Sequence, residues 1–354
     1  MKKTLLATAI IGALGASAAA QAATVYDQDG TRLDVYGRIA MGIEGGGPEY
    51  DSNDNYQDNG AEFVDVFSRL GLRMSQEVTS DLTAFGRLEW RFDGDENTTD
   101  GGFNEIRQSY LGLQSKQYGT FQAGNFDSFY NQFVSLPFDV YIDRGLEFAS
   151  HRKQSRGDSI GYYTPDLSGF TAFLQAKHYT ARGAADPSAD SEVAAQGGVR
   201  YAQGPVTIGL GFVDDVARID ENNASNGGGN DEMLYGLIGS YDVTDQFSLR
   251  LGYETRDDNE VRGGGFDTVG LGGTYTTGPW AFAADIYEVD PDGEESRTSW
   301  ALGTYYKVSS NFDVFVELQQ PDQQSINVTL DGSDSEINAD GDDMYWLTGA
   351  RYHF

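Results

Sequence analysis

The chain ends with MYWLTGARYHF, residues Met344 to Phe354, and the pattern of this stretch decides the fold class. Counting back from the last residue, every second side chain belongs to one mainly apolar face: Phe354, Tyr352, Ala350, Thr348, Trp346 and Met344. The residues between them are more polar and include His353, Arg351 and Asp343. A period of two over about ten residues is typical of a strand with one side in lipid. Aromatic residues near both ends of the apolar face suit the two membrane interfaces.

The same alternation recurs along the chain. Leu33, Val35 and Ile39 share one face of an early segment, while Asp34 and Arg38 share the other. We predict sixteen strands, at residues 33–44, 62–75, 82–92, 103–115, 120–124, 156–164, 170–178, 194–203, 206–213, 232–243, 247–255, 266–277, 280–288, 297–308, 312–319 and 342–354.

The connections between these strands alternate in length. One set consists of short turns such as 79–81 and 204–205, whereas the other consists of long acidic loops such as 45–60 and 321–341. Short turns on one rim and long loops on the other are typical of an outer-membrane barrel, and a soluble sandwich has no reason to separate them. The sequence therefore predicts an all-β fold, a 16-stranded antiparallel transmembrane β-barrel.

The longest connection, residues 125–155, reads NFDSFYNQFVSLPFDVYIDRGLEFASHRKQS and mixes aromatic with charged residues. A loop of this length within a compact domain is usually functional or disordered. Its aromatic content argues against disorder. We predict that this third long loop folds into the lumen and narrows it.

The N-terminus has the features of a cleaved secretory signal. Lys2 and Lys3 precede the apolar run 5–14, and Ala20-Gln21-Ala22 is a small-x-small cleavage pattern. The apolar run is too short for a spanning helix. We therefore expect a signal peptide at 1–22, an exported barrel at 23–354, and a location in the cell outer membrane.

Composition excludes several classes of function. The chain contains no cysteine and three histidines, which removes thiolate catalysis and leaves little material for a zinc site. Its formal charge of −31 argues against nucleic-acid binding. The segment Gly157 to Gly161 has the G-x-S-x-G pattern of hydrolases, but no helical pattern follows it, so we predict no enzyme. Strand alternation predicts that Ser159 faces lipid, opposite to Arg156.

Acidic clusters in the long loops, at 290–295, 331–336 and 340–343, supply oxygen ligands suited to Ca²⁺. None has the full EF-hand spacing, so solvated, mutually repulsive loops are the stronger interpretation and we expect no cofactor. Divalent bridging to lipopolysaccharide is the other hypothesis for these acids.

Several blocks of the chain resemble the trimeric general porins of the enteric, Gram-negative type. They include ATVYDQDGTRLDVYGR (23–38), SRLGLRM (68–74), SDLTAFGRLEW (80–90), LGLQSKQYGTFQAGNFDSFY (111–130), RGDSIGYYTPDLSGF (156–170) and the terminal ARYHF. The resemblance implies a homotrimer in outer-membrane lipid, a third loop inside the lumen, and passive passage of small hydrophilic solutes. The family's Pro-Glu-Phe-Gly-Gly loop segment is replaced here by residues within 136–148.

The resemblance assigns the basic wall of the pore constriction to Arg38, Arg69, Arg107 and Arg156. Arginines at one height on adjacent strands repel each other, so an opposing acid or open water is needed. The alternative is that each forms a lumen salt bridge with a nearby carboxylate. The inward-facing Arg73, Arg87 and Arg91 are second candidates, nearer the periplasm or paired with Glu89.

The acidic partner of this wall is expected on the inserted loop, at Asp139, Asp143 or Glu147, with Arg144 neutralising part of the charge. The alternative is that these acids only cap loop turns. The sequence thus predicts a general diffusion porin with a charged constriction and a mild cation preference. A substrate-specific porin with an aromatic track, and a barrel adhesin or receptor, are the competing hypotheses.

Overall fold

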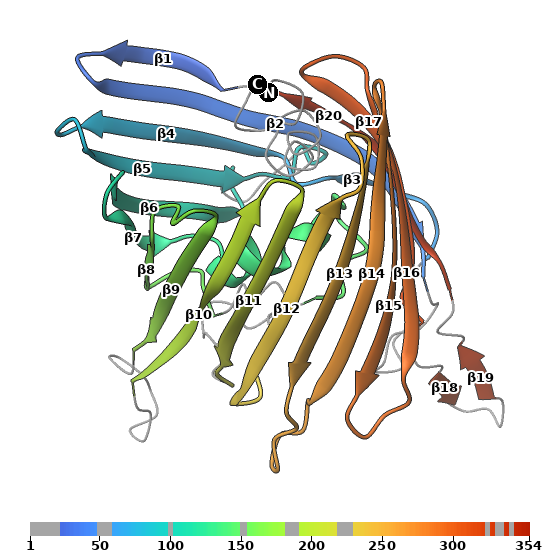
Figure 1. Cartoon of the computed structure of the whole chain (residues 1–354). Helices are drawn as coiled ribbons and strands as arrows, with labels where there is room; N and C mark the ends of the chain where they lie inside the picture. Colours follow the sequence, from blue (N-terminus) through green and yellow to red (C-terminus); the bar gives the residue numbers. More distant parts are fainter. Residues whose placement is uncertain are drawn as a thin grey trace.

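The computed structural model describes residues 22–47, 59–97, 102–148, 154–180, 191–217, 229–322, 326–329, 336–339 and 343–354. The described part is almost entirely β-structure, a closed barrel of antiparallel strands (Figure 1). No helix among the described residues is long and apolar enough to cross a membrane.

The strands of the main sheet follow the chain order and pair with their sequence neighbours. They are β1 (Ala23–Gln28), β2 (Thr31–Gly46), β3 (Glu62–Asp65), β4 (Arg69–Glu77), β5 (Leu82–Arg91), β6 (Glu105–Ser115), β7 (Gly119–Asn125), β8 (Ser159–Tyr163), β9 (Phe170–Tyr179), β10 (Glu192–Gln203), β11 (Val206–Asp215), β12 (Glu232–Asp242), β13 (Phe247–Arg256), β14 (Phe266–Thr277), β15 (Trp280–Pro291), β16 (Arg297–Lys307), β17 (Phe312–Gln320) and β20 (Tyr345–His353).

Two pairs of these segments act as single barrel strands, which gives the closed 16-strand barrel. β3 and β4 both pair with β2 and are separated by a short break. β20 pairs with the second half of β2, and β1 pairs with the first half, so together they form the closing strand. The backbones of Gly37 and Phe354 exchange two hydrogen bonds where β20 ends. All sixteen predicted strands are confirmed, whereas β1 was not predicted.

Side chains alternate between the two faces of the barrel wall as the sequence predicts. On β2, Ile39 and Ile43 are exposed on the outside, whereas Asp34 and Tyr36 are buried on the inside. On β20, Tyr352 is exposed, and Arg351 is 2% exposed. The apolar residues therefore face outward toward lipid, which is the reverse of a soluble fold.

Two local predictions of side-chain direction are wrong. Strict alternation from residue 64 to residue 74 predicts that Val66 and Ser68 face lipid with Leu70 and Leu72. Both are buried instead, because Phe67 between them has a φ of 63° and interrupts the alternation. Ser159 is also buried within the barrel. The turn at Gly157 and Asp158, both with positive φ, separates Ser159 from Arg156, so strand alternation does not relate these two residues.

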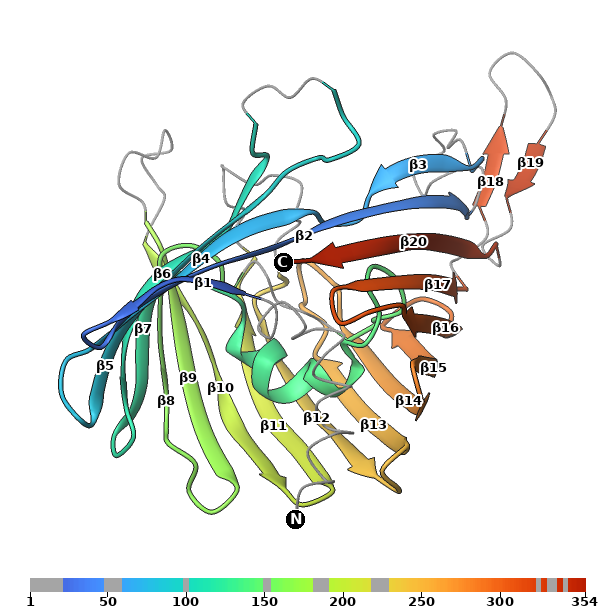
Figure 2. The ribbon, with the colours of Figure 1, turned by 90° about the horizontal axis from the view of Figure 1, so that it is seen from above.

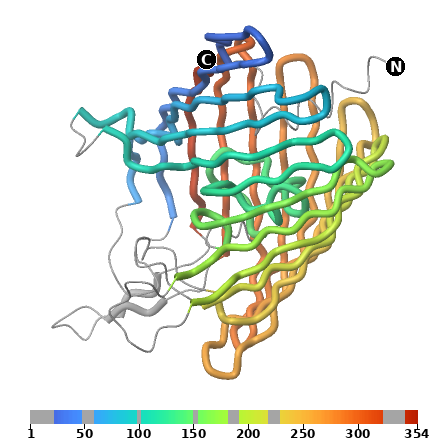
Figure 3. The backbone as a smooth tube through the Cα atoms, turned by 90° about the vertical axis from the view of Figure 1, so that its left-hand side faces the viewer, coloured from blue at the N-terminus to red at the C-terminus, as the bar shows by residue number. Residues whose placement is uncertain are grey.

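The described part of the long segment between β7 and β8, residues 126–148 and 154–158, lies inside the ring of strands (Figure 2). It carries two short helical turns, η1 (Asn131–Ser135) and η2 (Leu136–Phe138). The side view shows the same green segment within the tube of strands (Figure 3). A small hairpin, β18 (Ile326–Thr329) and β19 (Glu336–Ala339), forms a separate two-stranded sheet.

Candidate functional site: the charged inner wall and the inserted loop

Cross-strand registers place the charged residues of β2, β4 and β5 in three horizontal rows on the inner wall. The upper row aligns Arg38, Arg69 and Arg91, since each is paired directly with the next. The middle row aligns Tyr36, Gly71 and Glu89, and the lower row aligns Asp34, Arg73 and Arg87. Like charges directly opposite each other destabilise a sheet. The wall therefore needs a negative charge near its centre.

Glu89 provides that charge. Its side chain is 0% exposed and accepts hydrogen bonds from Tyr36 Oη at 2.7 Å, Arg87 Nη2 at 2.8 Å and Arg107 Nη1 at 2.5 Å. Arg69 Nη1 lies 3.4 Å from the same carboxylate. A buried carboxylate is tolerated only when it is paired and hydrogen-bonded. Glu89 therefore holds in place Arg69 and Arg107 of the predicted basic wall and the second-ranked Arg87.

Gly71 makes this arrangement possible. A Cβ at position 71 would collide with the ring of Tyr36, which crosses over the glycine toward Glu89. Arg87 Nε donates to the Tyr36 hydroxyl at 2.6 Å. The absence of a side chain in the middle row thus gives Tyr36 room to reach the Glu89 carboxylate.

A bulge in β6 adds Arg107 to the wall. The register with β5 shifts after Glu89, so two consecutive residues, Arg107 and Gln108, approach the lumen side. Both donate to Asp127 at the root of the inserted loop, at 3.2 and 2.5 Å. Burial would raise the pKa of Asp127, but the charges of Arg107 and Arg156 outweigh burial and hold this pKa below its ordinary value.

The other predicted basic residues occupy distinct positions on this wall. Arg156 bridges Glu105 at 2.6 Å and Asp127 at 3.0 Å, so it joins the end of the loop to its beginning. Arg38 is 7% exposed and donates from Nε to the carbonyl oxygen of Phe67 at 2.9 Å, at the break between β3 and β4. Arg69, Arg107 and Arg156 are each 12–16% exposed at the side chain.

The inserted loop is fixed to the far wall by aromatic packing. Its residues Phe126, Phe129, Tyr130, Val134 and Phe138 are almost fully buried and form one cluster with side chains of β9, β11, β12 and β15. Glycines on β11 and β12 leave space for the loop, because a Cβ at these positions would collide with loop atoms. Burial of each large apolar side chain stabilises the loop by about 1.5–3 kcal/mol. This packing is therefore the main force that holds the loop inside the barrel.

A carboxylate on β17 holds the tip of the loop. Glu317 is 1% exposed, and its oxygens accept the backbone N–H groups of Ile142 at 2.6 Å, Asp143 at 3.2 Å and Arg144 at 3.5 Å. Tyr305 Oη donates to Glu317 Oε1 at 2.7 Å. Charge-assisted hydrogen bonds of this kind are about twice as strong as neutral ones. Glu317 thus acts as a latch for the loop tip.

The three predicted loop acids differ in their surroundings. Asp139 and Asp143 are exposed, and Asp143 forms a salt bridge with Arg144 at 3.3 Å. Glu147 pairs with Arg297 on β16 at 2.7 Å and accepts a hydrogen bond from Ser299. Glu147 therefore anchors the loop to the barrel as well as contributing charge, which the sequence left open.

Sequence reasoning did not assign Glu317 or Asp127 to the site and mentioned Glu89 only as a partner of second-ranked arginines. The role of Glu89 was predictable, because this inward-facing acid has inward-facing arginines on the neighbouring strands. Glu317 gave no such signal, because three of its four partners are backbone groups about 175 residues away in the chain.

The described residues contain no cluster of three or more acidic or histidine side chains that could hold a metal ion. Of the three acidic clusters considered for Ca²⁺, only 290–295 is described completely. Most residues of 331–336 and 340–343 lie outside the described residues.

A family model described as Gram-negative porin matches residues 7–327. The chain belongs to this family. A monosaccharide porin from a Halomonas species is 27% identical over 370 residues, covering 100% of this chain and 91% of that protein. Outer membrane porin PhoE from Klebsiella pneumoniae is 35% identical over 175 residues, 49% of this chain and 44% of PhoE. The resemblance to enteric porins is confirmed.

Solved porin structures share the fold. An anion-selective porin from Comamonas acidovorans has a TM-score of 0.71 at 19% identity, covering 92% of this chain and 100% of that one. The trimer form of OmpT from Vibrio cholerae has a TM-score of 0.64 at 17% identity, with coverages of 92% and 100%. Membership of the Gram-negative porin family makes this chain an outer-membrane channel protein and not an enzyme.

Proposed function

We propose that this porin is a general diffusion channel, in which small hydrophilic solutes pass an eyelet between the arginine wall and the inserted loop. The observation that carries the proposal is the position of the loop inside a closed barrel, tied at its root by Asp127 and at its tip by Glu317. Charged groups lining a narrow passage favour polar solutes and ions over apolar ones.

The proposed selectivity is a mild preference for cations. Arginines outnumber the carboxylates Glu89, Glu105 and Asp127 on the basic wall. The loop side opposes them with Asp139, Asp143 and other acids, and the whole chain has a net charge of −31. The acids of the long loops attract cations to the mouth of the pore. The eyelet itself is close to balanced, so the preference is weak.

Liposome swelling with a series of neutral sugars tests the proposal against a substrate-specific porin. A general channel admits the sugars at rates that fall steadily with molecular size. A monosaccharide-specific channel, which the name of the Halomonas relative suggests, would instead admit one sugar much faster than others of its size. Liposomes that do not swell with any sugar would contradict both functions.

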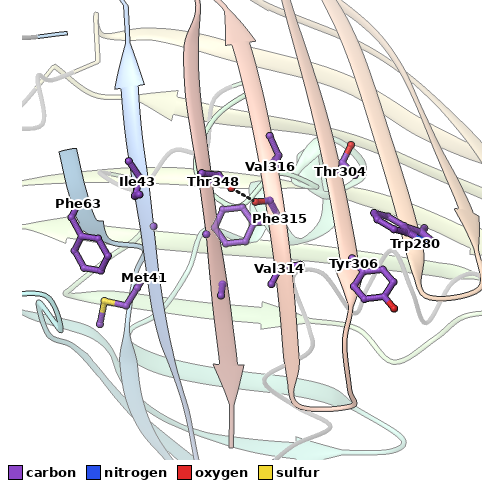
Figure 4. A pocket seen from close by; sticks show the side chains of 13 residues that line it. Met41, Ile43, Phe63, Trp280, Thr304, Tyr306, Val314, Phe315, Val316 and Thr348 are labelled. Carbon is purple, nitrogen blue, oxygen red and sulfur yellow. Dashed lines mark hydrogen bonds between the residues drawn. The ribbon is translucent and has the colours of Figure 1, made fainter. Parts of the chain in front are cut away.

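We further propose that three copies associate through an apolar groove on the outer wall. The groove holds about 650 Å³ and crosses β2, β20, β17, β16 and β15. Figure 4 shows side chains such as Ile43, Val316 and Trp280 along it, and its lining includes the small side chain of Ala350. Small residues allow close approach between subunits. Lipid and lipopolysaccharide would cover the remaining outer face.

A further inference from the structure

Two arginines and two aromatic residues face the lumen between the Glu89 cluster and the short-turn rim. Arg73 and Arg87 are directly opposite on β4 and β5, and Tyr110 is the cross-strand partner of Arg87 on β6. Phe85 is the next inward residue of β5. All four residues are half-buried, so each has part of its surface open to the lumen.

The two arginines differ in how their donors are used. Arg87 donates to Tyr36 at 2.6 Å and to Glu89 at 2.8 Å. Arg73 forms no salt bridge with any residue that the structure describes, since Asp34, its cross-strand partner on β2, pairs with Arg32 instead. The Arg73 guanidinium stacks over the Tyr36 ring at 4.2 Å from the centroid. Two like charges directly opposite repel each other. A solute anion bound to Arg73 would relieve this repulsion and use its donors.

The aromatic pair lies beside these charges. Phe85 and Tyr110 meet edge to face, with ring centroids 6.3 Å apart and an interplanar angle of 82°. Gly112, opposite Phe85, leaves room for the ring, since a Cβ there would collide with it. These rings offer an apolar surface with one hydroxyl group, so they suit a flat apolar ring better than a sugar, which needs several hydrogen-bonding partners.

We propose that this surface is a low-affinity site for aromatic monocarboxylates. The carboxylate accepts the N–H donors of Arg73. Arg87, whose Nε and Nη2 already donate to Tyr36 and Glu89, adds its positive charge to the site. The ring of the solute packs on Phe85 and Tyr110. This site rests on the proposed function. It adds that the general channel favours one class of solute, which binds on the short-turn side of the eyelet.

Block of KCl current by phenylacetate and by acetate, each titrated at neutral pH in a planar bilayer, tests the proposal. The two anions share a carboxylate, and only phenylacetate has a ring. We expect phenylacetate to block half of the current at a concentration about tenfold lower than acetate. Equal half-blocking concentrations, or tighter block by the sugar acid glucuronate, would overturn the proposal. A channel that conducts without this preference refutes only the site, whereas absence of conductance refutes the proposed function.

Three variants assign the effect to residues. Phe85→Leu keeps an apolar side chain and should reduce the phenylacetate-to-acetate ratio to about twofold or less. Arg73→Gln should weaken block by both anions and leave their ratio unchanged. Tyr345→Leu removes a half-buried aromatic residue of β20, where it lies under Arg144, and should leave all values unchanged. An unaltered ratio in Phe85→Leu would contradict the proposed role of the aromatic pair.

Discussion

The latch formed by Glu317 allows a quantitative prediction for Glu317→Gln. The carboxylate accepts four hydrogen bonds, from Tyr305 and from the backbone of Ile142, Asp143 and Arg144. The glutamine keeps one acceptor oxygen, which faces Tyr305 and the backbone N–H of Ile142. Its NH₂ group replaces the other oxygen and faces the backbone N–H donors of Asp143 and Arg144. Two long bonds are lost and the two short ones lose their charge assistance, at a total cost of about 3 kcal/mol. The equilibrium between the latched and released loop tip then shifts by about 100-fold.

Single-channel recording measures this change directly. Glu317→Gln should show frequent current fluctuations within each open step, because the released tip moves in and out of the eyelet. Glu288→Gln removes the same charge from β15, where Glu288 is exposed and accepts a hydrogen bond only from Thr298 among the described residues. This control should remain as quiet as the wild type. A quiet Glu317→Gln channel of wild-type conductance would refute the latch.

Three further predictions concern the basic wall and the loop root. Arg69→Gln should shift the reversal potential toward cations and Glu89→Gln toward anions, by about twofold in permeability ratio; unchanged values in both would exclude these residues from the eyelet. Arg107 and Arg156 hold the pKa of Asp127 low, so its stabilising ion pairs persist at neutral pH and are lost only as pH falls through that lowered value. Conductance should therefore stay constant from about pH 7 to about pH 4.5 and change below this range, and Asp127→Asn should abolish the acid transition. Gly71→Val should destabilise the barrel by about 2 kcal/mol in thermal unfolding, whereas Gly86→Ala, whose Cβ meets nothing closer than 3.5 Å, should not.

The strands were predictable because lipid and water impose opposite preferences on alternate residues. Each transmembrane segment therefore carries its own signal, and short turns such as 204–205 mark where one strand ends. β1 lacks this signal, since its side chains are exposed and it only completes the closing strand beside β2. The break at Phe67 also escaped prediction, because a single residue with positive φ leaves no periodic trace.

The inward arginines were predictable for the same reason, whereas their interactions depend on the barrel register. Arg38, Arg69 and Arg91 align only because β2, β4 and β5 pair in one particular register. The contact between Glu317 and the loop tip depends on barrel closure and on the path of the loop, which local patterns do not encode. Tertiary geometry thus decides which charges meet, while the sequence decides which face they occupy.

Conductance of the purified protein in a planar bilayer under a KCl gradient tests most directly whether the barrel is an open, weakly selective channel. We expect ohmic current steps that appear on insertion, closure in three equal steps from the proposed trimer, and a small reversal potential on the cation side. Folded protein that inserts without conducting would contradict an open eyelet. A strongly anion-selective reversal potential would instead show that the arginine wall dominates over the acidic loops.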